Sequence, residues 1–111
     1  MSAYVYLALA IVTEVMATCS LKLSDGFTRL VPSIVVVAGY ASSFWCLSQA
    51  LKSLQVGFTY PVWCGVGIIM VAIIGVTVLG ERVDWPGIAG MGLIIAGVIV
   101  MSAFSDMGKA A

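Results

Sequence analysis

Histidine is absent from the sequence, and charged residues are scarce. Only 9% of the 111 residues are charged, whereas 62% are hydrophobic. A soluble domain keeps about a quarter of its residues charged, so the charges present here are too few to cover a water-facing surface. The formal net charge is zero, which gives no reason to expect a nucleic-acid partner. The chain is therefore predicted to have the lipid bilayer as its main solvent.

Cysteine is also rare, and its arrangement does not favour a metal site. Cys19, Cys46 and Cys64 each lie in an apolar run, and no two of them form a CxxC pair. A structural zinc site needs four thiolate or imidazole ligands, which this spacing and the lack of histidine do not supply. We expect no metal site, and we interpret the thiols as packing residues.

Long stretches of the sequence carry almost no charge. A helix needs about 20 mostly apolar residues to cross a bilayer core. The apolar runs are continuous, so the alternating strands of a membrane barrel are excluded, and the backbone groups must be paired within helices. The sequence predicts an all-α membrane protein, with a single domain over residues 1–111 and four spans at about residues 3–22, 32–51, 57–79 and 85–104.

Local signals agree with these boundaries. Gly26 is expected to adopt the left-handed conformation that ends a helix. Pro32 and Pro86 fall in predicted first turns, where a missing N–H costs little. Asp84 is a candidate N-cap or first-turn anion. The connections between spans are short, so consecutive helices are expected to be antiparallel neighbours.

The basic residues are divided almost evenly between the two sides of the membrane. With four spans, Lys52 and Lys109 lie on the side of the termini, and Lys22, Arg29 and Arg82 lie on the other. Basic loop residues set the orientation of a membrane protein, and this bias is weak. The sequence therefore predicts dual topology, in which the chain inserts either way up, and this would permit an antiparallel pair of identical subunits.

Glu14 is the only acidic residue within the predicted spans. A helix that begins near residue 3 places it roughly 17 Å along the axis, near the middle of a core about 30 Å thick. Lipid disfavours the ionised carboxylate, so the group is expected to carry a proton, or to pair with a lipophilic cation when ionised. This exclusive choice is the minimal chemistry of an antiporter. The alternative is a protonated structural glutamic acid that hydrogen-bonds a neighbouring helix.

Several side chains are predicted to surround Glu14. Ala10 and Ala17 share its helix face and are expected to leave room beside the carboxylate, and Thr18 adds a hydroxyl. Aromatic rings bind cations through their faces, and ordinary helix packing is the alternative for these rings. On the second span, Tyr40 and Phe44 share a face with Ser43 and Leu47, and on the third span Tyr60 shares a face with Trp63. Tyr4 and Tyr6 lie at the start of the first span, where anchoring at the membrane interface is the alternative.

Glycine and proline mark the last two spans. Pro61, Gly65 and Gly67 favour a kink in the third span. Gly90 and Gly97 belong to a stripe of small residues on the fourth span, which favours close contact with another helix. The alternative is that this stripe only faces lipid. Four helices are too few to surround a substrate, so two copies of the chain, with two Glu14 carboxylates, are expected to form one shared site.

These features together resemble the small multidrug resistance family of bacterial transporters. The resemblance covers nearly the whole chain and includes Tyr4, Tyr6, Tyr40 and the order of the motifs. The matching segments are "TEVMATCSLK", "SDGFTRLVPS", "SFWCLSQAL", "GFTYPVWCGVG" and "GERVDWPGIAGMGLIIAGV".

The resemblance implies an antiparallel homodimer in the inner membrane that exports quaternary ammonium and other lipophilic cations against proton entry. It implies no cofactor and no enzymatic activity, with cations, protons, lipid and a second copy as partners. It makes Glu14 the shared proton and substrate carboxylate. The other residues implied are the aromatics Tyr40, Tyr60 and Trp63, the further lining residues Ala10, Thr18, Ser43, Phe44 and Leu47, the hinge at Gly65 and Gly67, and the dimer contact at Gly90 and Gly97.

The subtype and the substrate range rest on fewer residues. Met16 stands where the guanidinium-exporting branch tends to have tryptophan, which favours the multidrug branch. Pro61, Gln55 and Cys64 depart from the family's usual alanine, proline and serine or threonine. The alternatives are a guanidinium or small-amine exporter of the same fold, and a membrane subunit that does not transport or that pairs with a homologue.

Overall fold

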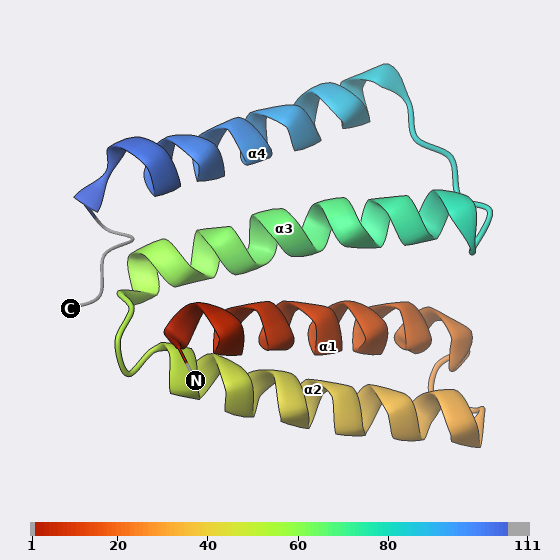
Figure 1. The fold of residues 1–111 in the computed structure, drawn as a ribbon. Helices are drawn as coiled ribbons and strands as arrows, with labels where there is room; N and C mark the ends of the chain where they lie inside the picture. The colour runs from red at the N-terminus through yellow and green to blue at the C-terminus, as the bar shows by residue number, and fades with distance from the viewer. Residues whose placement is uncertain (1, 107–111) are drawn as a thin grey trace. The chain divides into compact units, whose positions relative to one another are not determined.

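The computed structural model describes residues 2–106, and its four α-helices lie where the sequence predicts spans. The four helices are α1 (Ala3–Leu23), α2 (Leu30–Ala50), α3 (Val56–Thr77) and α4 (Trp85–Phe104) (Figure 1). Each is long and apolar enough to cross a bilayer, and the predicted ends lie within two residues of the observed ones. The prediction of four helical spans is confirmed. Lys109, one of the basic residues used to predict topology, lies outside the described residues.

The chain forms two compact units, and each is a hairpin of two helices. Unit 1 ends at Ala50 and contains α1 and α2, and unit 2 begins at Leu51 and contains α3 and α4. The single domain over residues 1–111 stays a prediction. Each unit is described by itself.

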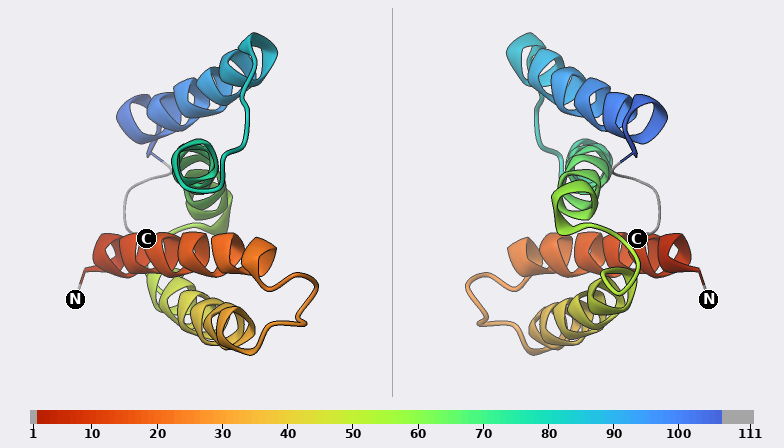
Figure 2. Two further views of the ribbon diagram at one scale, coloured as in Figure 1. Left: turned by 90° about the vertical axis from the view of Figure 1, so that its right-hand side faces the viewer. Right: turned by 90° about the vertical axis from the view of Figure 1, so that its left-hand side faces the viewer.

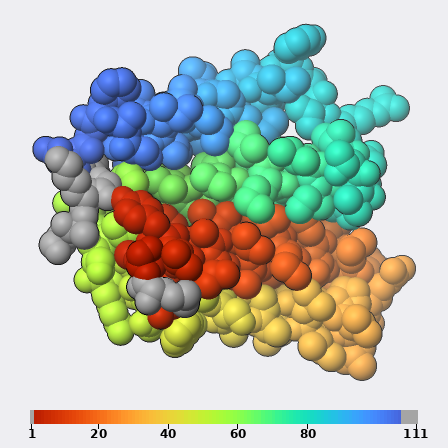
Figure 3. All heavy atoms as spheres, viewed as in Figure 1, coloured from red at the N-terminus to blue at the C-terminus, as the bar shows by residue number. Residues whose placement is uncertain are grey.

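Unit 1 is held together by small and branched apolar side chains. Its helices cross at an angle (Figure 2), and their side chains meet along the hairpin (Figure 3). Ser2 caps the start of α1, where its hydroxyl accepts a hydrogen bond from the Val5 amide at 3.3 Å. The buried residues are Leu7, Ala10, Ile11, Val15 and Ala17 on α1, and Val36, Ser43, Cys46 and Ala50 on α2.

The loop between α1 and α2 ends the first helix differently from the prediction. Gly26 is left-handed, with a φ of 72°, but Ser24 is the C-cap. Ser24 is fully buried, and its hydroxyl donates to the Leu21 carbonyl at 2.7 Å and accepts from the Phe27 amide at 3.1 Å. The predicted left-handed conformation of Gly26 is confirmed, but the helix ends earlier, at Leu23, because the left-handed stretch already begins at Asp25, with a φ of 50°.

Unit 2 contains α3, the helix that was predicted to bend. α3 continues as one helix through Pro61, Gly65 and Gly67, so proline does not end it. α4 starts at the predicted cap, because the Asp84 carboxylate accepts a hydrogen bond from the Gly87 amide at 2.9 Å. All of α4 lies within the described residues, and none of its side chains is buried.

Candidate functional site

A chain of three polar side chains runs from α1 to α2 within unit 1. The Thr18 hydroxyl donates a hydrogen bond to Oε1 of Glu14 at 2.7 Å. The same hydroxyl oxygen lies 2.7 Å from the hydroxyl of Tyr40. Helix periodicity explains the first contact, because residues four apart lie one above the other on a helix face. The second contact crosses to α2, so both helices hold the carboxyl group in place.

When Glu14 is ionised, only one arrangement of the protons is consistent with the hydrogen bonds among Glu14, Thr18 and Tyr40. An ionised carboxylate can only accept hydrogen bonds, and a hydroxyl has a single proton to donate. The Thr18 hydroxyl therefore donates its hydrogen bond to Glu14 and accepts one from the Tyr40 hydroxyl. A protonated carboxyl group is able to donate, so the order can reverse when Glu14 takes up a proton. The chain thus suits a carboxyl group that changes its charge.

The backbone beside Glu14 is fixed by a second contact between the helices. The Ser43 hydroxyl donates to the Ala10 carbonyl at 2.7 Å, and both residues are fully buried. That carbonyl lies one helical turn before Glu14, so α2 holds this turn of α1 from outside. Ser43 was predicted from the sequence to line the substrate site, and in unit 1 its hydroxyl serves this helix contact.

The small residues of α1 are close-packed, in contrast to the sequence-based expectation. Ala10 and Ala17 were expected to leave room beside the carboxylate, but both have no exposed surface. α2 fills the space, because Gly39 lies so close that a Cβ built there would be 2.8 Å from the Cβ of Ala17. The prediction of open space at these two positions is therefore wrong.

Several predicted aromatic residues form pairs in unit 1. The rings of Tyr40 and Phe44 stack with centroids 6.3 Å apart on the same face of α2. Tyr6 meets Trp45 edge to face across the two helices, with centroids 5.9 Å apart. Tyr4 is 51% exposed, and the predicted lining residue Leu47 is half-buried. The ring stack extends the polar chain from Tyr40 with an apolar, aromatic surface.

The remaining predicted site residues belong to unit 2. Tyr60 and Trp63 lie on one face of α3, with ring centroids 5.8 Å apart and planes inclined by 56°. Their grouping with each other follows from the predicted helix spacing. A site that they share with Glu14 stays a prediction.

The predicted hinge and contact glycines have different surroundings. Gly65 is buried against α4, where a Cβ built on it would be 2.7 Å from Cγ2 of Val98. Gly67 is also buried. A Cβ built on Gly90 or Gly97 would meet no atom within 4 Å. The two glycines of α4 therefore leave open space along this helix, and Gly65 lets the helices of unit 2 approach closely.

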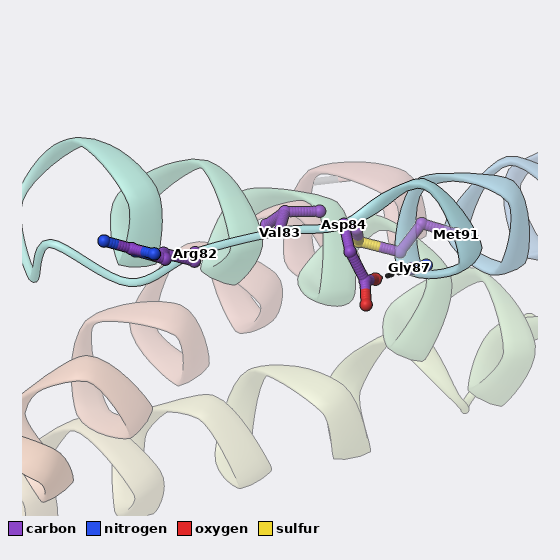
Figure 4. A pocket seen from close by; sticks show the side chains of 5 residues that line it. All are labelled: Arg82, Val83, Asp84, Gly87 and Met91. Carbon is purple, nitrogen blue, oxygen red and sulfur yellow. Dashed lines mark hydrogen bonds between the residues drawn. The ribbon is translucent and has the colours of Figure 1, made fainter.

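Two hollows on the surface include none of the predicted lining residues. One, of about 440 Å³, surrounds the start of α4 and is lined by Arg82, Val83, Asp84, Gly87 and Met91 (Figure 4). The Arg82 side chain points away from the Asp84 carboxylate, which caps the helix (Figure 4). The other, of about 280 Å³, lies in unit 1 and is lined by Thr13, Met16, Ile34, Val35, Ala38, Gly39 and Ser42.

Gly39, which precedes Tyr40, was not predicted from the sequence to belong to the site. The residue is one of several small residues on the second span, and nothing in its spacing marks it as special. Its role depends on which residue of α1 lies opposite. That register between two helices is not contained in the periodicity of either helix.

The chain is similar to known proteins over most of its length. Residues 2–94 match the model of a family described as Small Multidrug Resistance protein. The chain is 51% identical to quaternary ammonium compound-resistance protein QacF of Klebsiella aerogenes over 96% of its own length and 97% of the relative's. It is 43% identical to multidrug transporter EmrE of Escherichia coli strain K12, over 95% of its own length and 96% of the relative's.

Proposed function

The chain belongs to the small multidrug resistance protein family, and we propose that it exchanges protons for quaternary ammonium and other lipophilic cations. It is a multi-pass protein of the bacterial inner membrane. The relatives are described as multidrug transporters or as proteins of quaternary ammonium resistance, so the proposed cargo is an apolar cation. No covalent chemistry on the cargo is involved, and the proton gradient supplies the free energy.

The polar chain that ends on Glu14 is the observation that carries this proposal. A structural carboxyl group would need one fixed partner, whereas Thr18 and Tyr40 together accept either protonation state of Glu14. An ionised carboxylate in an apolar helix is costly without a counter-charge. A proton and a cation both remove that cost, and only one of them can do so at a time.

Exchange follows from this exclusive occupancy. A cation that arrives from the cytoplasm binds the ionised Glu14, and it leaves on the other side when a proton takes its place. The stacked rings of Tyr40 and Phe44 provide a surface for the apolar part of the cation. We propose that Tyr60 and Trp63 contribute a second aromatic surface, with Ala10, Ser43, Leu47 and Tyr4 as further parts of the site.

We propose that the functional unit is an antiparallel homodimer. One chain has one intramembrane carboxylate and two helix hairpins, which is little material for an enclosed site. The exposed α4, with open space at Gly90 and Gly97, suits close contact with a second copy. The weak bias of basic residues suits opposite orientations, and Gly65 and Gly67 are the proposed hinge of α3.

Proton release from purified protein tests the proposed exchange. Adding ethidium to the protein in weakly buffered detergent solution is expected to release protons, because the cation displaces them from Glu14. Glu14→Gln keeps the size of the side chain and removes its charge, so both the proton release and the ethidium binding are expected to disappear. Release of the same size from the variant would contradict the proposal.

Topology is tested by a reporter fused to the C-terminus. An antiparallel pair requires that the reporter be found on both faces of the membrane in similar amounts. Lys52→Ala is a useful second sample, because removing one basic residue from the side of the termini is expected to shift the distribution. A reporter confined to one face in both proteins would contradict the antiparallel pair.

A further inference from the structure

The contact between Gly39 and Ala17 lies directly beside the polar chain of unit 1. Gly39 precedes Tyr40 on α2, and Ala17 precedes Thr18 on α1. Ala17 has no exposed surface, and an atom added to Gly39 would meet it at once. The two helices therefore approach each other closely one residue before the position where the hydroxyls of Tyr40 and Thr18 meet.

We infer that Gly39 is a positioning residue for cation–proton exchange, because its missing side chain sets the distance across which Tyr40 reaches Thr18 and, through it, Glu14. This inference rests on the proposed function, and it concerns a residue that does not touch the carboxylate. Gly39 acts through the spacing of α1 and α2.

The distances show why an added methyl group matters. A Cβ on Gly39 would lie 2.8 Å from the Cβ and 3.4 Å from the Cα of Ala17, and 3.2 Å from the carbonyl oxygen of Thr13. Carbon atoms in contact normally lie about 3.5 to 4.0 Å apart, so the helices must separate by about 1 Å. These atoms belong to the backbone and to a side chain of one carbon, so rotation of a flexible group cannot relieve the overlap.

The same separation is large compared with the hydrogen bond that depends on it. Tyr40 and Thr18 lie at 2.7 Å, near the usual distance between two hydroxyl oxygens. An increase of about 1 Å takes the pair beyond the upper limit of about 3.0 Å for such bonds. Thr18 then loses the donor that supports it while it donates to Glu14. Hydrogen bonds to the charged form of a carboxyl group favour that form. Their weakening therefore favours protonation of Glu14, so that protons compete better with the cation.

Few other groups in unit 1 influence this competition. α2 carries no charged residue, and Tyr40 is its titratable group that faces Glu14. On α1 the other charged residue is Lys22, two helical turns further along. In the proposed homodimer the second copy carries the same groups, so a change in the pH dependence of cation binding after a substitution at Gly39 is attributed to the Tyr40–Thr18–Glu14 hydrogen bonds of both copies.

The test uses the full-length protein and ethidium as the probe cation. Gly39→Ala is expected to weaken ethidium binding roughly three- to tenfold at pH 7 and to raise the midpoint pH of binding by about 0.5 to 1 unit, as expected for one lost hydrogen bond. Gly92→Ala is the matched control, because a Cβ at Gly92 meets no atom within 4 Å and helix periodicity puts Gly92 on the opposite side of α4 from Gly90 and Gly97. It is expected to bind ethidium like the unmodified protein.

Two double variants separate positioning from a general packing defect. Ala17→Gly removes the atom with which the new methyl group collides, so Ala17→Gly with Gly39→Ala is expected to restore most of the original pH midpoint. In a Tyr40→Phe background the hydrogen bond is already absent, so Gly39→Ala is expected to shift the midpoint no further.

The outcomes distinguish this inference from the proposed function. If the unmodified protein releases no protons on ethidium binding, the proposed function fails. If it does, but Gly39→Ala leaves the pH midpoint unchanged, or shifts it equally in the Tyr40→Phe background, Gly39 is not a positioning residue and the exchange stands. A Gly39→Ala protein that no longer folds is decided by the Ala17→Gly double variant, whose failure to regain binding also contradicts the inference.

Discussion

Replacing Thr18 by valine isolates the contribution of the polar chain to cation binding. Valine keeps the branched shape and removes the hydroxyl, so Glu14 loses the donor at 2.7 Å and Tyr40 loses its partner. A hydrogen bond to a charged group contributes about 1.5 to 3 kcal/mol. Because the pair is only partly buried, the lower end applies, and about 1.4 kcal/mol corresponds to a tenfold change in affinity.

The expected effect depends on pH in a way that identifies its cause. Loss of the donor disfavours the ionised carboxylate, so near neutral pH the proton competes better and ethidium binding weakens about tenfold. At high pH no proton competes, and the affinity is expected to approach that of the unmodified protein. If Thr18 contacted the cation directly, its replacement by valine would instead weaken binding at every pH.

The assay is a set of ethidium titrations, followed by fluorescence, across the pH range. Thr13→Val is the matched control, because the Thr13 hydroxyl bonds only to backbone carbonyls of its own helix, those of Leu9 at 2.8 Å and Ala10 at 3.2 Å. The control is expected to keep the original pH profile. Identical pH profiles of ethidium binding for Thr18→Val and Thr13→Val would refute the role given to the hydrogen bonds among Glu14, Thr18 and Tyr40.

Two further predictions concern unit 2. Gly65→Ala places a methyl group 2.7 Å from Cγ2 of Val98, so it is expected to cost about 1 to 3 kcal/mol of stability. The loss is measured as a lower midpoint of thermal unfolding in detergent. If adding Val98→Ala to the Gly65→Ala protein does not raise the midpoint again, the close contact is not the cause. Trp63→Ala is expected to weaken ethidium by up to about 2 kcal/mol through the lost cation–π contact and guanidinium by much less; equal losses in titrations of both cations would remove the aromatic surface from the proposed site.

The fold could be predicted from the sequence because lipid imposes strict requirements on the chain. Continuous apolar runs with few charges leave only helices, and their lengths follow from the thickness of the bilayer. Asp84 was correctly predicted as an N-cap because capping depends on neighbours within one turn. The left-handed conformation of Gly26 was also predicted correctly, but the sequence did not show that Asp25 is left-handed as well, so that α1 ends at Leu23.

The site was predictable only where it depends on a single helix. Glu14 and Thr18 share a face at a spacing of four, and the structure joins them by a hydrogen bond. Contacts between helices depend on their relative register, which periodicity does not contain. For this reason the sequence predicted open space at Ala17, whereas the structure places Gly39 against it.

Transport by reconstituted protein tests the exchange at Glu14 most directly. Liposomes that contain this chain alone, with a pH difference imposed across the membrane, are expected to move ethidium from the alkaline to the acidic side, and dissipation of the gradient is expected to stop the movement. Vesicles with Glu14→Gln at equal protein content are expected to show no transport. Gradient-driven ethidium transport by Glu14→Gln, or transport by the unmodified protein that is indifferent to the pH difference, would contradict the exchange of protons for cations at Glu14.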